Sequence, residues 1–433
     1  MITVVIIFVV ILGVLVFVHE LGHFLMARRN GIRAQEFGFG LPPRIVGIQF
    51  VSGEKLEKIS EGRSLEVEIS DTQNEGEPEV IREVITEKTQ EIDRIKSVRK
   101  WRFIWGRYDG DDTEEEADLK EARDNRFSGG TVYSLNWIPL GGFVRIKGED
   151  RENQDRDSFA VKPAWTRIKV LGAGVVMNFI FAWIILAIVF WVGVPEAINP
   201  EDNLSQGKIQ ISEVSANSPA ENNGLRVGDE IAKIQNGFEF RSVKSVQDYI
   251  NASKGKEINL KIIRGKEVVE FKAVPREESF AGEGALGVGL VQTVVVKYSW
   301  YAAIWEGLLA VFDLTTRIFW GILGMIKSLI LGEGAKIEVA GPVGIAFLTK
   351  QVASLGLVYV LQFAAILSIN LGIINALPIP ALDGGRILFI LIEKIRRRPI
   401  SQKVEQFFHT AGFALLIGLM ILITFRDVMK FFE

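Results

Sequence analysis

The sequence predicts a multi-pass α-helical membrane protein that also carries a β-rich soluble domain. Hydrophobic residues make up 48% of the 433 residues and charged residues 24%, and the two kinds are segregated into separate blocks. Several apolar blocks reach about 20 residues, the length that a helix needs to cross the hydrocarbon core. A central stretch of short apolar runs separated by turn residues predicts strands.

The composition excludes several classes of function. The net charge of −3 gives no general reason to expect binding to nucleic acid, so we predict no such partner. The chain contains no cysteine, which excludes a disulfide framework, a thiolate zinc site and a cysteine nucleophile.

Four segments are predicted to span the membrane, and a fifth apolar segment is expected to lie in its interface. Residues 1–27 lack the basic start and the small-residue cleavage site of a signal peptide, so we interpret them as a retained span. The other predicted spans are residues 168–194, 354–385 and 404–426. Residues 298–332 carry charged side chains at intervals, which favours an amphipathic interfacial helix.

Lysine and arginine residues near the predicted spans indicate their orientation. One cluster follows the first span, one precedes the second, and one lies between the third and the fourth. All three clusters fall on the same side of a four-span protein, and that side is expected to be cytoplasmic. Both termini would then lie outside the cytoplasm.

Two regions are expected outside the membrane. Residues 54–126 are highly charged and alternate only in part, so we expect a solvated cytoplasmic insert, with a regulatory module as the alternative. This insert contains an aromatic stripe at a spacing of two, formed by Trp101, Phe103 and Trp105. Residues 200–292 have apolar runs between turn residues, which predicts a compact β-rich domain with one or two helices.

Two histidines at the end of the first span form the main candidate site. His19 and His23 are four residues apart and therefore share a helix face, so both imidazoles can reach one metal ion. Glu20 lies beside them, where a carboxylate can take a proton from a metal-bound water. Ionisable side chains at membrane depth are costly and therefore indicate a function.

The end of the third span supplies a third candidate ligand. Pro378 and Pro380 cannot both lie in a regular helix, and irregular backbone at membrane depth survives where it lines a cavity or is buried in protein. Asp383 follows them; taken alone, it could be a surface turn residue. Two histidines and one carboxylate are a ligand set of catalytic zinc, so we predict Zn2+ as the cofactor.

The chain resembles the site-2 protease family of intramembrane zinc metalloproteases, whose bacterial branch includes the regulator-of-sigma-E proteases. The matching segments are HELGHFLMAR, IPLGGFVRIKGE, GPVGIA and NALPIPALDGGR. They cover nearly the whole chain outside residues 54–126. The resemblance implies that His19, His23 and Asp383 bind zinc and that Glu20 is the catalytic glutamate.

The same resemblance implies contacts with an extended substrate. Residues that match the lining of the substrate path are Asn375, Pro378 and Pro380. A membrane-reentrant β region is expected over residues 31–53 and 127–150. The glycines of this region that are expected to contact the substrate are Gly141 and Gly142.

Residues 200–292 are similar to the PDZ domain of the family. The strand that would offer backbone groups to a peptide end is represented by Leu286, Gly287 and Val288. Steric exclusion of bulky substrates is the alternative role of this domain. The family motif A-G-P-x-x-N reads AGVVMN here, so its proline is missing and the role of Asn178 is a weaker transfer.

The resemblance completes the expected fold and function. The fold is a multi-pass α-helical membrane protein with about four transmembrane helices, a membrane-reentrant β-hairpin and one β-rich PDZ-like extracytoplasmic domain. The function is that of an intramembrane zinc metalloendopeptidase in regulated intramembrane proteolysis, located in the bacterial inner membrane. The expected partners are the lipid bilayer and membrane-spanning substrates such as an anti-sigma factor or signal-peptide remnants, while the sequence does not indicate an oligomeric state.

Two other functions are open from the residues. A membrane zinc protease of another class would take a later glutamate as its third ligand, and no apolar helix here offers one. A membrane-anchored PDZ scaffold without protease activity would need neither the histidine pair nor Asp383. His409 could be an outer group or a replacement ligand of the site, or a polar residue near the headgroups.

Overall fold

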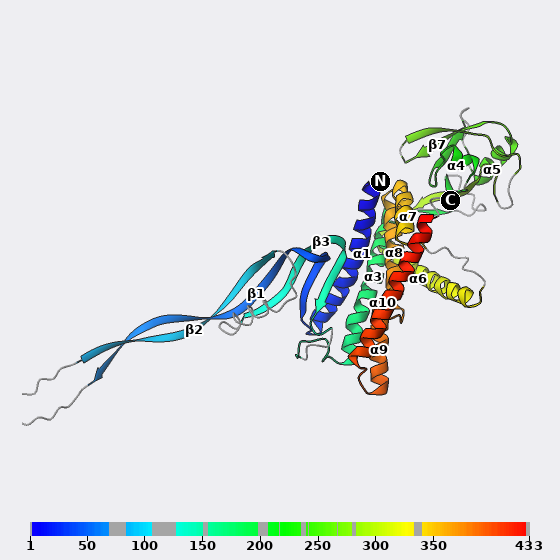
Figure 1. Cartoon of the computed structure of the whole chain (residues 1–433). Helices are drawn as coiled ribbons and strands as arrows, with labels where there is room; N and C mark the ends of the chain where they lie inside the picture. The colour runs from blue at the N-terminus through cyan, green and yellow to red at the C-terminus, as the bar shows by residue number, and fades with distance from the viewer. Residues whose placement is uncertain are drawn as a thin grey trace, which may run out of the picture.

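The chain folds into three parts, which are a bundle of long helices, a three-stranded sheet beside it and a six-stranded domain at one end (Figure 1). Both chain termini lie at the end of the bundle that carries the six-stranded domain. This computed structural model describes residues 2–429 apart from 69–83, 106–126, 150–154, 198–206, 216, 235–239, 241, 266, 279–282 and 333–339.

The helical bundle is organised around α3. Its helices are α1 (Ile2–Arg29), α3 (Ala164–Val192), α6 (Trp300–Ile330), α7 (Pro342–Leu355), α8 (Leu357–Ala376), α9 (Asp383–Arg396) and α10 (Gln402–Met429). Helix α3 contacts α1, α6, α8 and α9. Buried residues in the core that includes α3 and α8 are Ala182, Val189, Ala365 and Ile369. Small residues such as Ala182 and Ala365 let apolar helices approach closely, as is common for helices that associate in a bilayer.

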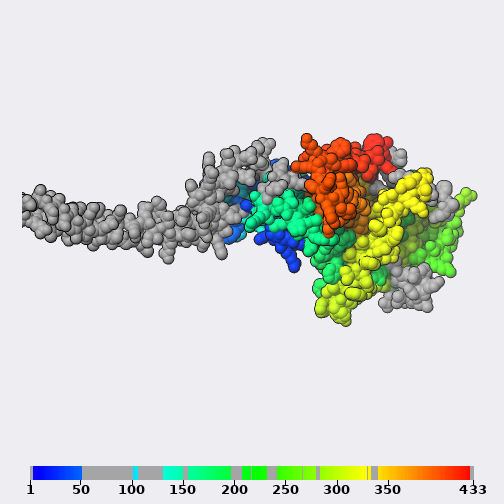
Figure 2. Space-filling model, turned by 90° about the horizontal axis from the view of Figure 1, so that it is seen from below, coloured from blue at the N-terminus to red at the C-terminus, as the bar shows by residue number. Residues whose placement is uncertain are grey.

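Five of the described helices are long and apolar enough to cross a membrane, namely α1, α3, α6, α8 and α10. The chain is therefore a multi-pass membrane protein with a β domain. Helix α6, where the sequence predicts an interfacial helix, has the lowest mean hydropathy of the five, 1.5 against 2.1 to 2.9. It is seen lengthwise in the view along the bundle, so it runs across the other helices (Figure 2).

The third predicted span, residues 354–385, is divided in the structure. Helix α8 ends at Ala376, a short loop follows, and α9 begins at Asp383. The loop contains Pro378 and Pro380, which lack the N–H groups that a continuous helix would use. This division places a carboxylate at the first residue of α9.

The three-stranded sheet is curled, because its last strand pairs on both edges with different parts of its first strand. Its strands are β1 (Ala34–Glu68), β2 (Val84–Trp105) and β3 (Phe127–Ile146), in the antiparallel order β2-β1-β3. Leu135 of β3 pairs with both Phe39 and Val46 of β1, so β3 lies between two halves of the same strand. The β1–β2 pair continues outward as a long hairpin through residues 54–68 and 84–100 of the predicted insert. The rest of that insert, apart from 101–105 of β2, lies outside the described residues.

The six-stranded domain occupies the region where the sequence predicts strands and one or two helices. Its strands are β4 (Val194–Ala197), β5 (Lys208–Val214), β6 (Glu230–Ile234), β7 (Ile258–Arg264), β8 (Glu267–Ala273) and β9 (Val288–Val296). Their order is β4-β9-β5-β6-β7-β8. The helices of the domain are α4 (Pro219–Asn222) and α5 (Val243–Ala252). Alternate residues of β7 are buried, as expected for a strand with one face on the core.

We predict that Gly307→Ala weakens the packing of α6 on α3. A Cβ at Gly307 would lie 2.8 Å from the backbone nitrogen of Ala187, so one backbone must move. Such overpacking costs about 1–3 kcal/mol. The thermal unfolding midpoint of the purified protein should fall for Gly307→Ala. Gly321→Ala on the same helix is the matched control, because a Cβ there meets nothing within 4 Å. Equal midpoints for both variants would contradict this packing.

Candidate metal centre

Helix α1 presents two buried histidines on one face near its C-terminal end. His19 and His23 are each 6% exposed. Their Nε2 atoms lie 3.1 Å apart, and the two ring planes are nearly perpendicular. The spacing of one helical turn, which the sequence predicts, therefore brings both nitrogens to one point.

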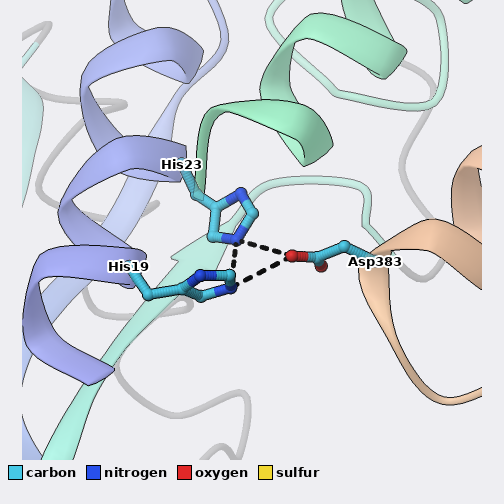
Figure 3. A group of neighbouring side chains, drawn as sticks. All are labelled: His19, His23 and Asp383. Carbon is cyan, nitrogen blue, oxygen red and sulfur yellow. Dashed lines mark hydrogen bonds and ion pairs between the residues drawn. The ribbon is translucent and has the colours of Figure 1, made fainter. Parts of the chain in front are cut away.

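Asp383 meets this point from the start of α9 (Figure 3). Its Oδ2 atom lies 3.0 Å from His19 Nε2 and 3.3 Å from His23 Nε2. Within the described chain, Oδ2 is buried with no hydrogen-bond donor other than these imidazoles. The three atoms therefore form a compact triangle of two nitrogens and one oxygen.

This triangle fits a zinc ion. Zinc binds histidine nitrogen and carboxylate oxygen at about 2.0–2.2 Å in tetrahedral sites, which makes the ligand-to-ligand edges about 3.3–3.6 Å. The observed separations of 3.0 to 3.3 Å are close to that edge. A single ion can thus be held by all three atoms after small side-chain movements.

Outer hydrogen bonds orient both imidazoles. His23 Nδ1 lies 2.8 Å from the carbonyl of Val170 and can donate to it, which leaves the lone pair of His23 on Nε2. The side-chain amide of the fully buried Asn178 lies 3.1 Å from His19 Nδ1. An amide can be turned either way, and with its oxygen toward Nδ1 it leaves the lone pair of His19 on Nε2 as well.

Two glycine positions provide the space for the histidines. A Cβ at Gly174 of α3 would lie 2.4 Å from His23 Nε2 and 2.7 Å from His19 Cε1. A Cβ at Gly22 of α1 would lie 2.3 Å from the carbonyl oxygen of Ala173. Helices α1 and α3 therefore approach so closely at the site that neither position accepts a side chain without movement.

Helix α10 contacts the loop that precedes Asp383. The N–H of Ala381 donates a hydrogen bond of 2.9 Å to His409 Nδ1 of α10. Ala381 has a φ of 77°, a left-handed conformation that costs a non-glycine residue about 1–2 kcal/mol. A Cβ at Gly412 of α10 would lie 2.6 Å from the carbonyl oxygen of Pro380. Two close contacts from α10 thus fix the backbone just before Asp383.

The candidate site opens into a cavity of about 560 Å³. Glu20, His23 and Asp383 line it. The ion pair between Glu149, which follows β3, and Arg386 of α9 also borders the cavity. The carboxylate predicted to move a proton therefore shares one space with two of the predicted ligands.

The residues expected to contact substrate are not among those that line this cavity. Asn375 is half-buried in the last turn of α8, and Pro378 is exposed in the loop that follows. Gly141, with a φ of 87°, packs against Val16 of α1, and Gly142 packs against Phe17. The turn of the predicted reentrant hairpin is therefore docked on α1, just before the histidine pair.

In the six-stranded domain, the predicted peptide-binding residues are partly engaged by the fold itself. Leu286 is buried and its carbonyl accepts a hydrogen bond from Ala220 N–H. The carbonyl of Gly287 accepts one from Ser215 N–H. Val288 begins β9, which pairs with β5.

Sequence reasoning missed Gly174 as a site residue and treated His409 chiefly as a polar residue at a helix end. A small residue followed by glycine, Ala173-Gly174, in an apolar helix is the pattern of close helix contact and could have pointed to the first. The contact of His409 with Ala381 depends on how α10 returns to the loop, which no local pattern encodes.

The sequence is similar to those of known zinc metalloproteases. The family model of peptidase family M50 matches residues 7–57 and 123–419. The regulator of sigma-W protease RasP of Bacillus subtilis is 32% identical over 447 residues, which cover 99% of each chain. The zinc metalloprotease RasP of Bacillus licheniformis is also 32% identical, over 444 residues and 99% of each chain. A putative zinc metalloprotease of Clostridium perfringens is 29% identical over 96% of this chain and 95% of its own.

The family match covers most of the chain, and the two relatives at 32% identity extend over nearly all of it. The match takes in the histidine pair, the loop before α9 and Asp383. The chain belongs to peptidase family M50, the site-2 protease family of membrane zinc metalloproteases.

Proposed function

We propose that this chain hydrolyses peptide bonds in transmembrane segments of other membrane proteins, with zinc bound by His19, His23 and Asp383. The observation that carries the proposal is the convergence of three ligand atoms from two apolar parts of the chain. Polar side chains in such a setting are energetically costly, so their presence indicates a function. The cost is best explained by a catalytic metal.

Glu20 is the proposed general base. It lines the same cavity as His23 and Asp383 and is adjacent in sequence to His19. Its carboxylate takes the proton of the attacking water and delivers it to the leaving nitrogen of the cleaved peptide bond. Zinc, when bound, supplies Lewis-acid chemistry that polarises the scissile carbonyl and makes water more acidic.

A substrate helix must unwind before it can be cut, because its peptide groups are hydrogen-bonded within the helix. The hairpin turn at Gly141 and Gly142 is supported as a docking edge by its position beside α1, next to the histidines. An extended substrate that pairs with this hairpin would keep its backbone groups satisfied. Asn375 would donate to the substrate carbonyl, while Pro378 and Pro380 would shape the path.

The arrangement of charged residues and domains supports one orientation in the inner membrane. Both termini and the six-stranded domain would lie outside the cytoplasm, and the charged part of the insert at 54–126 on the cytoplasmic side. Helices α1, α3, α8 and α10 would be the four spans. Helix α6 would lie in the interface, as its crosswise direction and its lower hydropathy favour.

The six-stranded domain is proposed to be a PDZ-like domain that screens substrates. Strand β4 pairs with β9 only over residues 293–296, so residues 288–292 keep an edge without a strand partner in the described chain. Helix α5 contacts β9 and would form the other wall of a peptide groove. A peptide end could add to this edge as a strand.

Regulated intramembrane proteolysis is the proposed cellular role. The Bacillus subtilis relative is named regulator of sigma-W protease RasP, which supports a membrane-bound anti-sigma factor as a proposed substrate here. Remnants of signal peptides are the second proposed substrate class. Like an anti-sigma factor that has already been trimmed outside the membrane, they would present a single helix without a bulky outer domain.

We predict that Glu20→Gln abolishes cleavage while zinc remains bound. Loss of a general acid–base group should lower the rate at least about 100-fold. The assay is cleavage of truncated single-span membrane proteins in proteoliposomes, with zinc measured on the same sample. Asp313→Asn is the control, because this exposed acid of α6 is not among the residues that line the cavity. Equal cleavage by parent and Glu20→Gln would remove Glu20 from the mechanism.

A second prediction concerns the space at Gly174. Gly174→Ala should strip zinc from the purified protein, since the new methyl group would lie 2.4 Å from His23 Nε2. Elemental analysis measures the metal directly. Gly172→Ala, two residues earlier on the same helix, should keep its zinc because a Cβ there meets nothing within 4 Å. Equal zinc content in both variants would argue against the proposed ligand positions.

A third prediction tests how α10 supports Asp383. His409→Leu removes the acceptor of the Ala381 N–H, and an unpaired buried donor costs about 1–3 kcal/mol. The variant should then lose its zinc at a lower chelator concentration than the parent protein does. His409→Asn should restore retention, because its side-chain oxygen can accept the same hydrogen bond. If the leucine variant holds zinc as firmly as the parent, the support from α10 is not needed.

A further inference from the structure

We propose that the outer part of the three-stranded sheet carries a lipid-binding surface, seated in the leaflet beside the C-terminal end of α1. The aromatic surface, as we name it, consists of Trp101, Phe103 and Trp105 of β2 with Leu135 and Trp137 of β3. None of these residues lines the cavity of the candidate metal centre, so the proposal does not depend on protease activity. Its β2 residues also fall between residues 57 and 123, where the family model finds no match.

Strand register places these side chains on one face of the sheet. The cross-strand rows are Trp105–Val46–Leu135 and Phe103–Ile48–Tyr133. Directly paired residues share a face, and residues two apart on one strand do so as well. The three tryptophans and Phe103 are between 62% and 75% exposed. A run of large apolar side chains is therefore uncovered on a single face.

The same face is buried where it reaches α1. Phe37 of β1 pairs with Tyr133 and is only 8% exposed. Its ring stacks on Phe24 of α1 with centroids 4.6 Å apart and also contacts Phe17 at 5.1 Å. The inner part of this face thus packs on a membrane-spanning helix, and the aromatic surface continues it sideways.

Contacts with α1 supply a depth scale for the sheet. The carbonyl of Pro139, in the turn of β3, approaches Gly13 in the middle of α1. Further along the sheet, Tyr133 accepts a hydrogen bond of 3.1 Å from Arg28 at the end of α1. These two levels are 15 helical residues apart, or about 22 Å at about 1.5 Å per residue. The exposed residues of β3 fall between them, alongside the apolar part of α1.

Lipid is the occupant that suits this position. Tryptophan and tyrosine are enriched where hydrocarbon meets the headgroups, and Arg28 with Arg29 offers charge to anionic lipids at that level. The opposite face of the sheet has the other character, because Gln49, Ser134 and Asn136 are buried there as polar groups. The aromatic surface continues the sheet face that packs on α1, so it lies where lipid surrounds that spanning helix.

The absence of cysteine makes the test direct, because a single cysteine can be labelled at any position. Trp105→Cys and Trp137→Cys report on the aromatic surface from two strands. Arg102→Cys points to the opposite face of β2 at an exposed position, and Lys272→Cys is an exposed control on the six-stranded domain. Each full-length variant is labelled with bimane and reconstituted in vesicles of phosphatidylethanolamine and phosphatidylglycerol.

The expected result is a reversal of quenching between the two faces of β2. Lipids brominated on their acyl chains should quench the labels at 105 and 137, while iodide in the buffer should not. The labels at 102 and 272 should respond mainly to iodide. Strong iodide quenching at 105 and 137 would overturn the proposal.

Protection from both quenchers would also overturn it, because the occupant would then be protein. Self-quenching that grows with the protein-to-lipid ratio would identify that protein as a second copy of this chain. Protection that appears only after a truncated single-span protein is added would identify a substrate. Unfolding midpoints equal to that of the parent exclude misfolding as the cause, since the replaced tryptophans are exposed.

Discussion

The meeting of His19, His23 and Asp383 inside an apolar bundle is the constraint on which the surrounding structure depends. Three polar groups that lie 3.0 to 3.3 Å apart must be held together in an apolar setting, where unpaired polar groups are costly. Their supports come from elsewhere in the chain, because α3 supplies a carbonyl and the amide of Asn178 to the imidazoles. Both imidazoles are thus oriented by groups of α3.

Helix packing follows from the same requirement. Imidazole rings fit between α1 and α3 only because glycine stands at position 174. The carboxylate reaches them only because two prolines end α8 and a strained residue, Ala381, redirects the chain into α9. Helix α10 then closes over that loop through His409. The site therefore depends on the packing of α1, α3, α9 and α10. Loosening any one of these helices should displace the ligand atoms.

Local pattern predicted much of this architecture. Apolar length predicted spans where the structure has α1, α3 and α10, but the span predicted over 354–385 is divided between α8 and the start of α9. The i, i+4 spacing of the histidines predicted their shared face. The paired prolines predicted broken backbone before Asp383, but the distance from that carboxylate to the imidazoles depends on how α1, α3 and α9 pack. The contact of His409 with Ala381 and the space at Gly174 arise from residues far apart in sequence. The long β1–β2 hairpin was also out of reach, since a charged, weakly alternating segment resembles a solvated one until its partner strand is known.

The hairpin formed by β1 and β2 restricts how this region can vary among related chains. A segment inserted at its far end leaves the inner rows unchanged, because the added residues lie beyond the pairs near Val46 and Trp105. A deletion of one residue in a single arm near Val46 or Trp105 would instead turn every following side chain to the other face. Length changes should therefore accumulate at the far end of the hairpin, while the number of residues in each arm near the inner pairs should stay constant.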